Sequence, residues 1–149
     1  MSITIRNAEI NDKERCLELL DALGVATGSS TGSRKTPAAG DVFELLLSGE
    51  RGRIIVAEEA GAILGMATVS YNLAVRYGGE YCQLEELIVD SAARGKNVGG
   101  QLVQKTVDNA RERGCAEYGL YLLESTEHNR PFYAKYGFET IGTEMRQRL

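Results

Sequence analysis

The sequence predicts an α/β fold, in which helices pack against one mixed sheet. Strand-like and helix-like patterns alternate along its 149 residues, as is typical of this class. Between positions 84 and 107, a buried apolar strand leads through a Gly-rich turn into an amphipathic helix. The length is close to that of one domain, so we expect residues 1–149 to form a single domain. The expected order is β-α-α-β-β-β-α-β-α-β, with one further strand at the end left open.

The first third of the chain predicts a short strand followed by two helices. Residues 3–6 alternate apolar and polar side chains, as a strand does. The Asn-Asp pair at 11–12 can cap the next helix, which Gly24 would end. Residues 24–40 are rich in Gly, Ser and Thr and predict a long loop, either a plain connector or a wall of the substrate site. A short helix is expected over residues 42–47.

Strand patterns dominate the middle of the chain. Residues 53–58 and 63–73 are apolar runs around an Ala-Gly turn, which predicts a hairpin. Residues 81–89 become apolar on both faces toward their end, as expected of a buried central strand.

The last third returns to alternating elements. Apolar residues from 98 to 110 share one helical face, and Gly114 would end this helix. We expect a strand over residues 117–123, a short helix over residues 129–136, and one or two closing strands over residues 138–148.

Charge and cysteine content narrow the class of protein. The chain is 43% hydrophobic and 26% charged with a formal net charge of −4, which argues against a general nucleic-acid binder. Cys16, Cys82 and Cys115 lack paired spacing, so neither a disulfide framework nor a metal site is expected. The N-terminus does not look like a signal peptide, and no apolar run is long enough to span a membrane. We therefore expect a cytoplasmic protein without a membrane partner.

The Gly-rich turn at residues 90–100, D-S-A-A-R-G-K-N-V-G-G, carries the most specific chemistry. It opens a helix, so several backbone N–H groups remain unpaired at the positive end of the helix dipole. Such donors bind phosphate or pyrophosphate, and Arg94 and Lys96 add two positive charges. The turn therefore predicts the binding site of a phosphorylated cofactor.

Three segments in this order resemble motifs of one family. They are L-E-E-L-I-V-D at 84–90, R-G-K-N-V-G at 94–99 and N-R-P-F-Y-A-K-Y-G-F at 129–138. Together they resemble the GNAT superfamily of acetyl-CoA-dependent N-acetyltransferases. The resemblance implies a GNAT-like fold with a mostly antiparallel central sheet, flanked by helices, and the cofactor in a splay between two parallel central strands. It also implies direct transfer of an acetyl group from acetyl-CoA to a primary amine of a small molecule or protein.

The resemblance assigns acetyl-CoA binding to the turn and its neighbours. Backbone N–H groups of the turn would hold the pyrophosphate. A bulge in the preceding strand would free backbone groups of Leu87 and Val89 for the pantetheine arm, and the Leu87 N–H would polarise the thioester carbonyl. Asn97 replaces the first Gly of the family motif, and Asn is the non-Gly residue that best tolerates a left-handed backbone. The implied cofactor-binding residues are Leu87, Ile88, Val89, Arg94, Gly95, Lys96, Asn97, Val98, Gly99, Gly100, Asn129 and Tyr133.

Acetyl transfer to an amine needs a base, because the amine is protonated at neutral pH. By analogy with diamine acetyltransferases, Glu85 would remove the proton, directly or through water, and Glu86 would contact the cationic substrate. Strand alternation predicts Glu85 and Leu87 on one face and Glu86 on the other. Tyr133 matches the family tyrosine that donates to the departing thiolate.

Several residues keep two interpretations. Asn129 either contacts CoA or caps a helix. His128 fits a surface or capping role better than a catalytic one. The tyrosines Tyr71, Tyr77 and Tyr81 either line the acceptor pocket or lie at the sheet surface.

Two other functions compete with catalysis. One is a non-catalytic acyl-CoA-binding or sensor module. The other is a different nucleotide-binding α/β domain, although the chain lacks G-x-G-x-x-G and G-x-x-x-x-G-K-[ST]. The identity of the acceptor amine stays open, and the resemblance also implies a possible homodimer.

Overall fold

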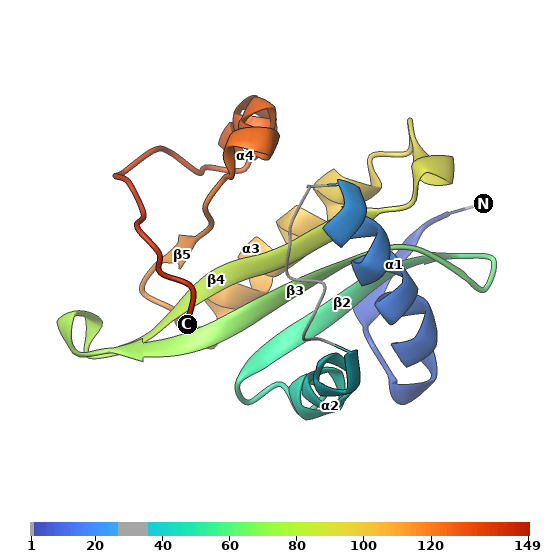
Figure 1. Cartoon of the computed structure of the whole chain (residues 1–149), viewed down its shortest axis with the longest axis horizontal. Coiled ribbons are helices and arrows are strands. Elements are labelled where there is room, and N and C mark those ends of the chain that lie inside the picture. Colours follow the sequence, from blue (N-terminus) through green and yellow to red (C-terminus); the bar gives the residue numbers. More distant parts are fainter. Residues whose placement is uncertain (1, 27–35) are drawn as a thin grey trace.

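A computed structural model describes residues 2–26 and 36–149. Five strands form one sheet in the order β1-β2-β3-β4-β5, in which only the β4–β5 pair is parallel (Figure 1). The strands are β1 (Thr4–Asn7), β2 (Gly52–Glu59), β3 (Ala62–Ala74), β4 (Gly79–Val89) and β5 (Tyr118–Gly119). This mixed, mostly antiparallel sheet confirms the predicted fold class.

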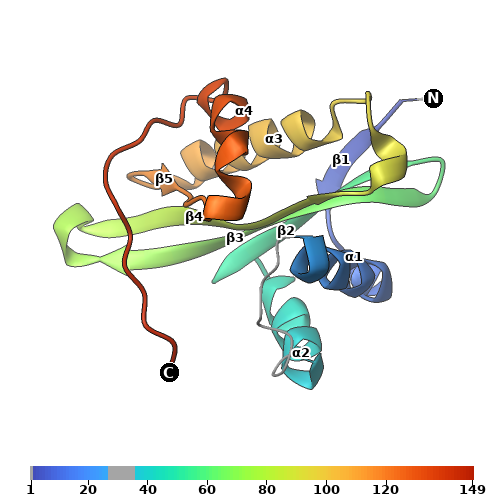
Figure 2. The same ribbon diagram turned by 45° about the horizontal axis from the view of Figure 1, so that its top comes forward.

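Helices cover both faces of the sheet. The helices α1 (Lys13–Ala26) and α2 (Thr36–Leu46) lie on one face, and α3 (Val98–Arg113) and α4 (Arg130–Ala134) lie on the other (Figure 2). Short 3-10 turns are η1 (Ile10–Asp12), η3 (Val75–Tyr77), η4 (Ser91–Ala93) and η5 (Glu124–Asn129). The faces are called the α3 face and the α1/α2 face below.

Each face buries its own apolar cluster. Along β2, Ile55 faces the cluster beneath α3, whereas Ile54 and Val56 face the cluster beneath α1 and α2. Along β3, Ala67 faces the cluster beneath α3, and Met66 faces the cluster beneath α1 and α2. This period of two is expected where a strand is covered on both sides. Each fully buried aliphatic side chain contributes roughly 1.5–3 kcal/mol, so the two clusters fix the register of these strands.

Two helix boundaries differ from the prediction. Gly24 does not end the first helix, which continues to Ala26, and the second helix already begins at Thr36. The remaining part of the predicted loop, residues 27–35, lies outside the described residues. Asp12 is part of η1 and accepts the Glu9 N–H there at 2.8 Å.

The C-terminal strands are where the prediction is wrong. The predicted strand over residues 117–123 is reduced to the two residues of β5, and no strand forms over residues 138–148. Instead, this segment runs past the end of the sheet toward the α1/α2 face (Figures 1 and 2). Its apolar side chains Ile141 and Met145 are 88% and 92% exposed. Without a buried face, alternation alone does not hold a strand in place.

Candidate active site

A β-bulge at Glu85 determines the geometry of β4. Thr68 on β3 is paired with Glu86, but the next residue, Val69, is paired with Leu84. Glu85 is therefore the extra residue that faces no partner. A bulge shifts the alternation of side chains by one position, so β4 has a different phase on each side of Glu85.

The bulge turns both glutamates to the same face of the sheet. Ser70 Oγ donates to Glu85 Oε2 at 2.6 Å, and Thr68 Oγ1 donates to Glu86 Oε1 at 2.7 Å. Thr68 and Ser70 are two residues apart on β3, so they share a face, which is the α1/α2 face of Met66. The prediction that Glu85 and Glu86 lie on opposite faces is wrong, because it assumed unbroken alternation.

The bulge also directs two backbone donors away from β3. The Asp90 N–H donates to the Leu64 carbonyl on β3 at 2.8 Å. Because donors alternate along an antiparallel strand, the N–H groups of Leu87 and Val89 point to the opposite edge. There β4 is paired with β5 only at two positions near its start, so the edge beside these donors is open. The splay predicted between two parallel strands begins here, although β5 is an edge strand among the described residues.

The turn after β4 presents unpaired amides at the start of α3. Asn97 has φ 54° and ψ 37°, the left-handed backbone expected of this residue. Among the described residues, no acceptor is found for the N–H groups of Asn97, Val98, Gly99 and Gly100. A Cβ on Gly100 would lie 2.1 Å from Tyr136 Oη and 2.3 Å from Asn97 Oδ1. Any larger residue at position 100 would therefore force the side chains of Tyr136 and Asn97 to move.

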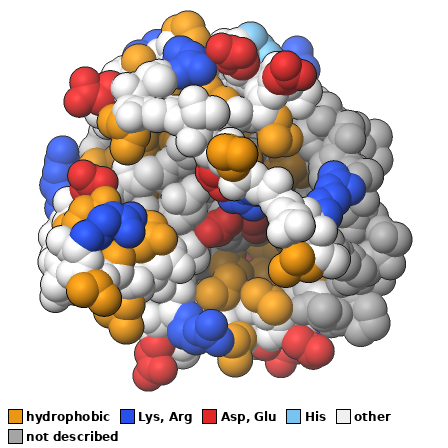
Figure 3. Space-filling model, turned by 60° about the vertical axis from the view of Figure 1, so that its left-hand side comes forward, with side chains coloured by type: hydrophobic (Ala, Val, Ile, Leu, Met, Phe, Trp, Pro, Cys, Tyr) orange, Lys and Arg blue, Asp and Glu red, His pale blue; other side chains and the backbone are white. Residues whose placement is uncertain are grey.

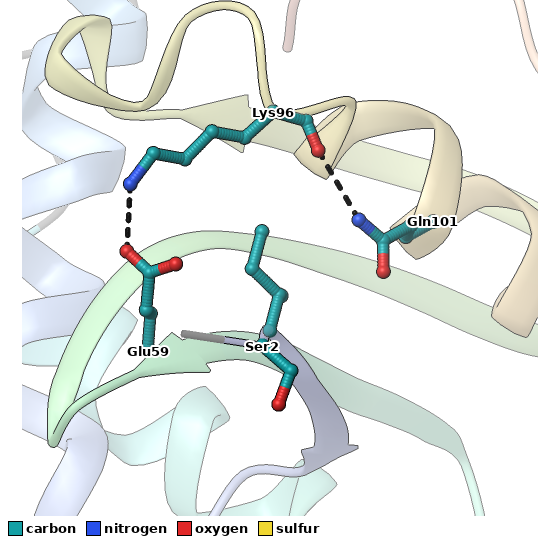
Figure 4. Close-up of a pocket in the computed structure, with 5 residues that line it drawn as sticks. Ser2, Glu59, Lys96 and Gln101 are labelled. Atoms are coloured by element: carbon teal, nitrogen blue, oxygen red, sulfur yellow. Dashed lines mark hydrogen bonds and ion pairs between the residues drawn. The ribbon is translucent and has the colours of Figure 1, made fainter.

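Lys96 is turned away from these amides (Figure 4). Its Nζ pairs with Glu59 Oε1 at 2.6 Å, and its carbonyl accepts from Gln101 Nε2 at 3.2 Å, beside an open pocket of about 660 Å³ that Ser2 also lines. Arg94 forms no side-chain hydrogen bond or ion pair with any described residue. Of the two predicted cations, Arg94 is therefore the one whose charge is not paired with a described carboxylate.

The two glutamates have different surroundings. Burial raises the pKa of Glu86 and outweighs the Thr68 hydroxyl, which lowers it, and the nearby charge of Glu85 raises it further. Glu85 itself is exposed. Figure 3 shows a hollow on the side where β5 and the C-terminal segment lie, with charged side chains at its floor and apolar ones around it. Two adjacent carboxylates favour a cationic ligand.

Tyr133 lies on the other side of the sheet. It belongs to α4, which is on the α3 face (Figure 2), and packs against the α3-face cluster and the rings of Phe132 and Phe138. Burial raises the pKa of Tyr133, so its hydroxyl stays protonated at neutral pH. No described residue forms a hydrogen bond with this hydroxyl, which leaves it available as a donor.

Asn129 and His128 lie at the end of η5. Asn129 is the N-cap residue of α4, although its side chain makes no capping hydrogen bond, and contact with CoA stays a prediction. His128 is exposed, in line with the surface role expected of it.

The structure corrects the placement of Tyr71. It is 8% exposed and packs in the α3-face cluster, opposite Glu85, with Arg113 Cζ 3.8 Å from its ring centroid. The rings of Tyr77 and Tyr81 lie 5.6 Å apart near the end of the β3–β4 hairpin. Tyr81 is opposite Asn72 in the sheet, on the same face as Ser70, so it remains a candidate for the acceptor side.

Sequence reasoning missed three residues near the glutamates, namely two hydrogen-bond partners and one cation. Thr68 and Ser70 hold the two carboxylates, but recognising them requires the register of β3 against β4. The third, Arg146, lies in the C-terminal segment, with Cζ 4.1 Å from the Tyr121 ring centroid. The hydrogen bond to Glu144 raises the pKa of Arg146, and the charge of Glu85 adds to this increase. The C-terminal segment therefore contributes charge near Glu85.

No cluster of His, Cys, Asp or Glu that could hold a metal ion is found among residues 2–26 and 36–149. No helix in these described ranges is both long and apolar enough to cross a membrane. The three cysteines are free, and two of them, Cys16 and Cys82, are buried.

A bulged strand that diverges from a parallel neighbour, with a helix N-terminus just beyond its end, is the architecture of an acyltransferase that takes its acyl group from a coenzyme thioester. Comparison with known proteins identifies the family. The chain belongs to the acetyltransferase (GNAT) family, whose family model matches residues 18–138. GNAT acetyltransferases in general use acetyl-CoA. The predicted N-acetyltransferase activity is thus confirmed and favoured over a non-catalytic acyl-CoA-binding module.

Two of the similar proteins carry N-acetyltransferase names, and a third shares the fold under another name. A protein from Oryza sativa subsp. japonica, named probable glucosamine 6-phosphate N-acetyltransferase 2, is 32% identical over 97% of this chain and 86% of its own length. The crystal structure of glucosamine-6-phosphate N-acetyltransferase from Arabidopsis thaliana is 29% identical, with a TM-score of 0.79 and 99% coverage of both chains. A transcriptional regulator from Bacillus halodurans C-125 is 27% identical, with a TM-score of 0.83, covering 99% of this chain and 100% of that one.

Proposed function

We propose that the chain acetylates the primary amine of an amino sugar, and that glucosamine 6-phosphate is the first acceptor to test. The names of its relatives in rice and Arabidopsis support this substrate. The observation that carries the proposal is the bulge at Glu85. It brings two carboxylates to one face for an ammonium group and leaves the Leu87 N–H open at the adjacent edge. A cytoplasmic location and a homodimer stay predictions.

The residues present fit acetyl-CoA as the donor, which supplies an acetyl group activated as a thioester. In this proposal, the free amides of residues 97–100 bind the pyrophosphate, and the uncommitted charge of Arg94 lies beside them. The backbone of Leu87 and Val89 pairs with the pantetheine arm, and the Leu87 N–H donates to the thioester oxygen. Lys96 takes part only after it leaves Glu59.

Residues on both faces of β4 assist the transfer. Glu86 contacts the substrate ammonium, and Glu85 accepts its proton, directly or through water. Tyr133 donates a hydrogen bond to the leaving sulfur from the α3 face. Transfer is direct, because Cys82 is buried on the face opposite Glu85 and burial raises the pKa of its thiol to about 12.

The test combines turnover with binding. Thiol release from acetyl-CoA is measured with glucosamine 6-phosphate, glucosamine, an aminoglycoside and a lysine peptide, and CoA binding is measured by calorimetry. We expect CoA binding and the highest kcat/KM with an amino sugar. CoA binding without turnover of any amine would favour the non-catalytic module. Preference for the lysine peptide would contradict the small-molecule acceptor but leave the donor site intact.

A further inference from the structure

A second concave surface lies on the α3 face, away from the bulge. Arg53 of β2, Tyr71 of β3 and the C-terminal half of α3 line a pocket of about 540 Å³, which lies within the size range of small-molecule sites. Lys105, which faces it, follows Val98 by seven residues and so lies roughly 10 Å further along the helix axis. This pocket is therefore separate from the free amides at the start of α3.

The charged side chains that line this pocket are mostly positive, and some of them have no ion-pair partner among the described residues. Arg113 is paired with Glu80 at 2.8 Å and Arg6 with Asp12 at 2.8 Å, so both charges are compensated. Arg53 and Lys105 form no ion pair or hydrogen bond with any described residue, although both line the pocket. Glu112 is the single carboxylate in the lining and is exposed. Two unpaired cations thus face one carboxylate in the lining, which leaves an excess of positive charge.

Arg53 adds a second, independent observation. Its Nε is buried and has no hydrogen-bond partner in the part of the chain that the structure describes. Most buried donors in native proteins are paired, and leaving a charged one unpaired is costly. A water molecule or a bound ligand can supply the missing acceptor. Because a guanidinium presents a planar fork of donors, a phosphate or carboxylate group matches it best.

We propose that this pocket binds an anion bearing a phosphate group, either free phosphate or a small phosphate monoester. The phosphate lies between Arg53 and Lys105, whose two charges match those of a dianion. The Asn109 side chain, which lines the same wall, supplies a neutral donor. The Tyr71 ring, held under Arg113, forms an apolar surface for the rest of a larger ligand. This site takes no part in the proposed acetyl transfer.

The test is calorimetric titration of the full chain, saturated with CoA, with inorganic phosphate and with glucose 6-phosphate. Bound CoA occupies the proposed donor site, and the pocket variants below separate binding here from binding of glucose 6-phosphate at the acceptor site. We expect saturable binding that weakens with added salt. Tighter binding of glucose 6-phosphate identifies a phosphate monoester as the ligand, and equal binding identifies free phosphate.

Two variants and a matched control keep the proposal falsifiable. Lys105→Gln changes an exposed helix position at little cost in helix propensity, and Arg53→Lys keeps the charge but removes the buried Nε–H. Each is expected to weaken phosphate binding by about tenfold or more. Lys96→Gln, on the donor side of α3, should leave phosphate binding unchanged. The proposal is overturned if wild type shows no saturable binding up to ~10 mM, or if Lys105→Gln binds phosphate as wild type does.

Discussion

The two halves of β4, before and after Glu85, have opposite characters. Before the bulge, the strand is paired on both sides, and Cys82 and Leu84 are buried beneath α3. After the bulge, the edge toward β5 is open, two carboxylates share the α1/α2 face, and the Leu87 N–H has no strand partner among the described residues. One inserted residue thus separates a structural half from a chemical half. Variants that affect only the second half should change activity and leave folding intact.

The largest expected effect is that of Glu85→Gln. Removing the proposed proton acceptor should lower kcat/KM by about 10²- to 10⁴-fold, because a general base typically contributes that much. CoA affinity and the melting temperature should stay at the wild-type value, since Glu85 is exposed. Steady-state kinetics and calorimetry measure both. Glu139→Gln, another exposed glutamate, is the control, and wild-type turnover in Glu85→Gln would show that Glu85 is not the base.

The next effect tests the turn that continues β4. Gly100→Ala would place a methyl group 2.1 Å from Tyr136 Oη and 2.3 Å from Asn97 Oδ1, so both side chains must shift. Because Asn97 belongs to the turn, we expect CoA affinity to fall by about tenfold or more. Gly99→Ala is the matched control, because its Cβ would meet Phe132 and Val89 at an ordinary 3.6 Å. Calorimetry with CoA compares the two. Wild-type CoA affinity in Gly100→Ala would contradict a pyrophosphate site at the start of α3.

Tyr133→Phe removes the proposed donor on the α3 face. We expect kcat to fall by about tenfold or more. This is less than general acid catalysis typically contributes, because a thiolate is a good leaving group and needs only a hydrogen bond. The melting temperature should hardly change, because no described residue bonds to this hydroxyl. The raised pKa of Tyr133 keeps the hydroxyl protonated, so wild-type kcat should show no loss from tyrosine ionisation up to about pH 10. A variant with wild-type kcat at all pH values would remove Tyr133 from the mechanism.

Sequence reasoning succeeded where local identity decides the structure. Asn97 was expected to adopt a left-handed backbone, and it does so. It failed at Glu85, because a bulge depends on how β3 and β4 are registered and not on β4 alone. It also failed over residues 138–148, because alternation does not reveal whether a strand edge is available. Tyr71 was misplaced for a related reason, since the face of a residue follows from the register.

A smaller effect is expected for Glu86→Gln. Losing a partly exposed ion pair with the substrate ammonium should raise KM for the amine by about fivefold, with little change in kcat. In wild type, KM should rise as pH falls through the raised pKa of Glu86, because the carboxylate then loses its charge. The variant should lack this dependence, and pH profiles of KM measure the difference.

The same raised pKa makes a prediction about stability. A carboxyl whose folded-state pKa is raised destabilises the folded protein at pH values above that pKa, where the charge is buried. Glu86→Gln should therefore melt at a higher temperature than wild type at pH 7, and the difference should disappear below the unfolded pKa of about 4.3. A variant less stable than wild type at pH 7 would show that the carboxylate is stabilised by its neighbours.

The smallest effect is expected for Lys96→Gln. Its ammonium is committed to Glu59 at the surface, so CoA affinity and melting temperature should change little, by less than about 1 kcal/mol in free energy. Arg94→Gln should weaken CoA binding more, because the Arg94 charge is uncommitted. Calorimetry on both variants decides, and a larger loss in Lys96→Gln would mean that Lys96 leaves Glu59 when CoA binds.

The most direct measurement is a crystal structure of the chain with acetyl-CoA bound. We predict that the thioester carbonyl accepts the Leu87 N–H while the carboxylates of Glu85 and Glu86 both lie on the α1/α2 face. A β4 strand without the extra residue at position 85, or a coenzyme bound away from its open edge, would contradict the account.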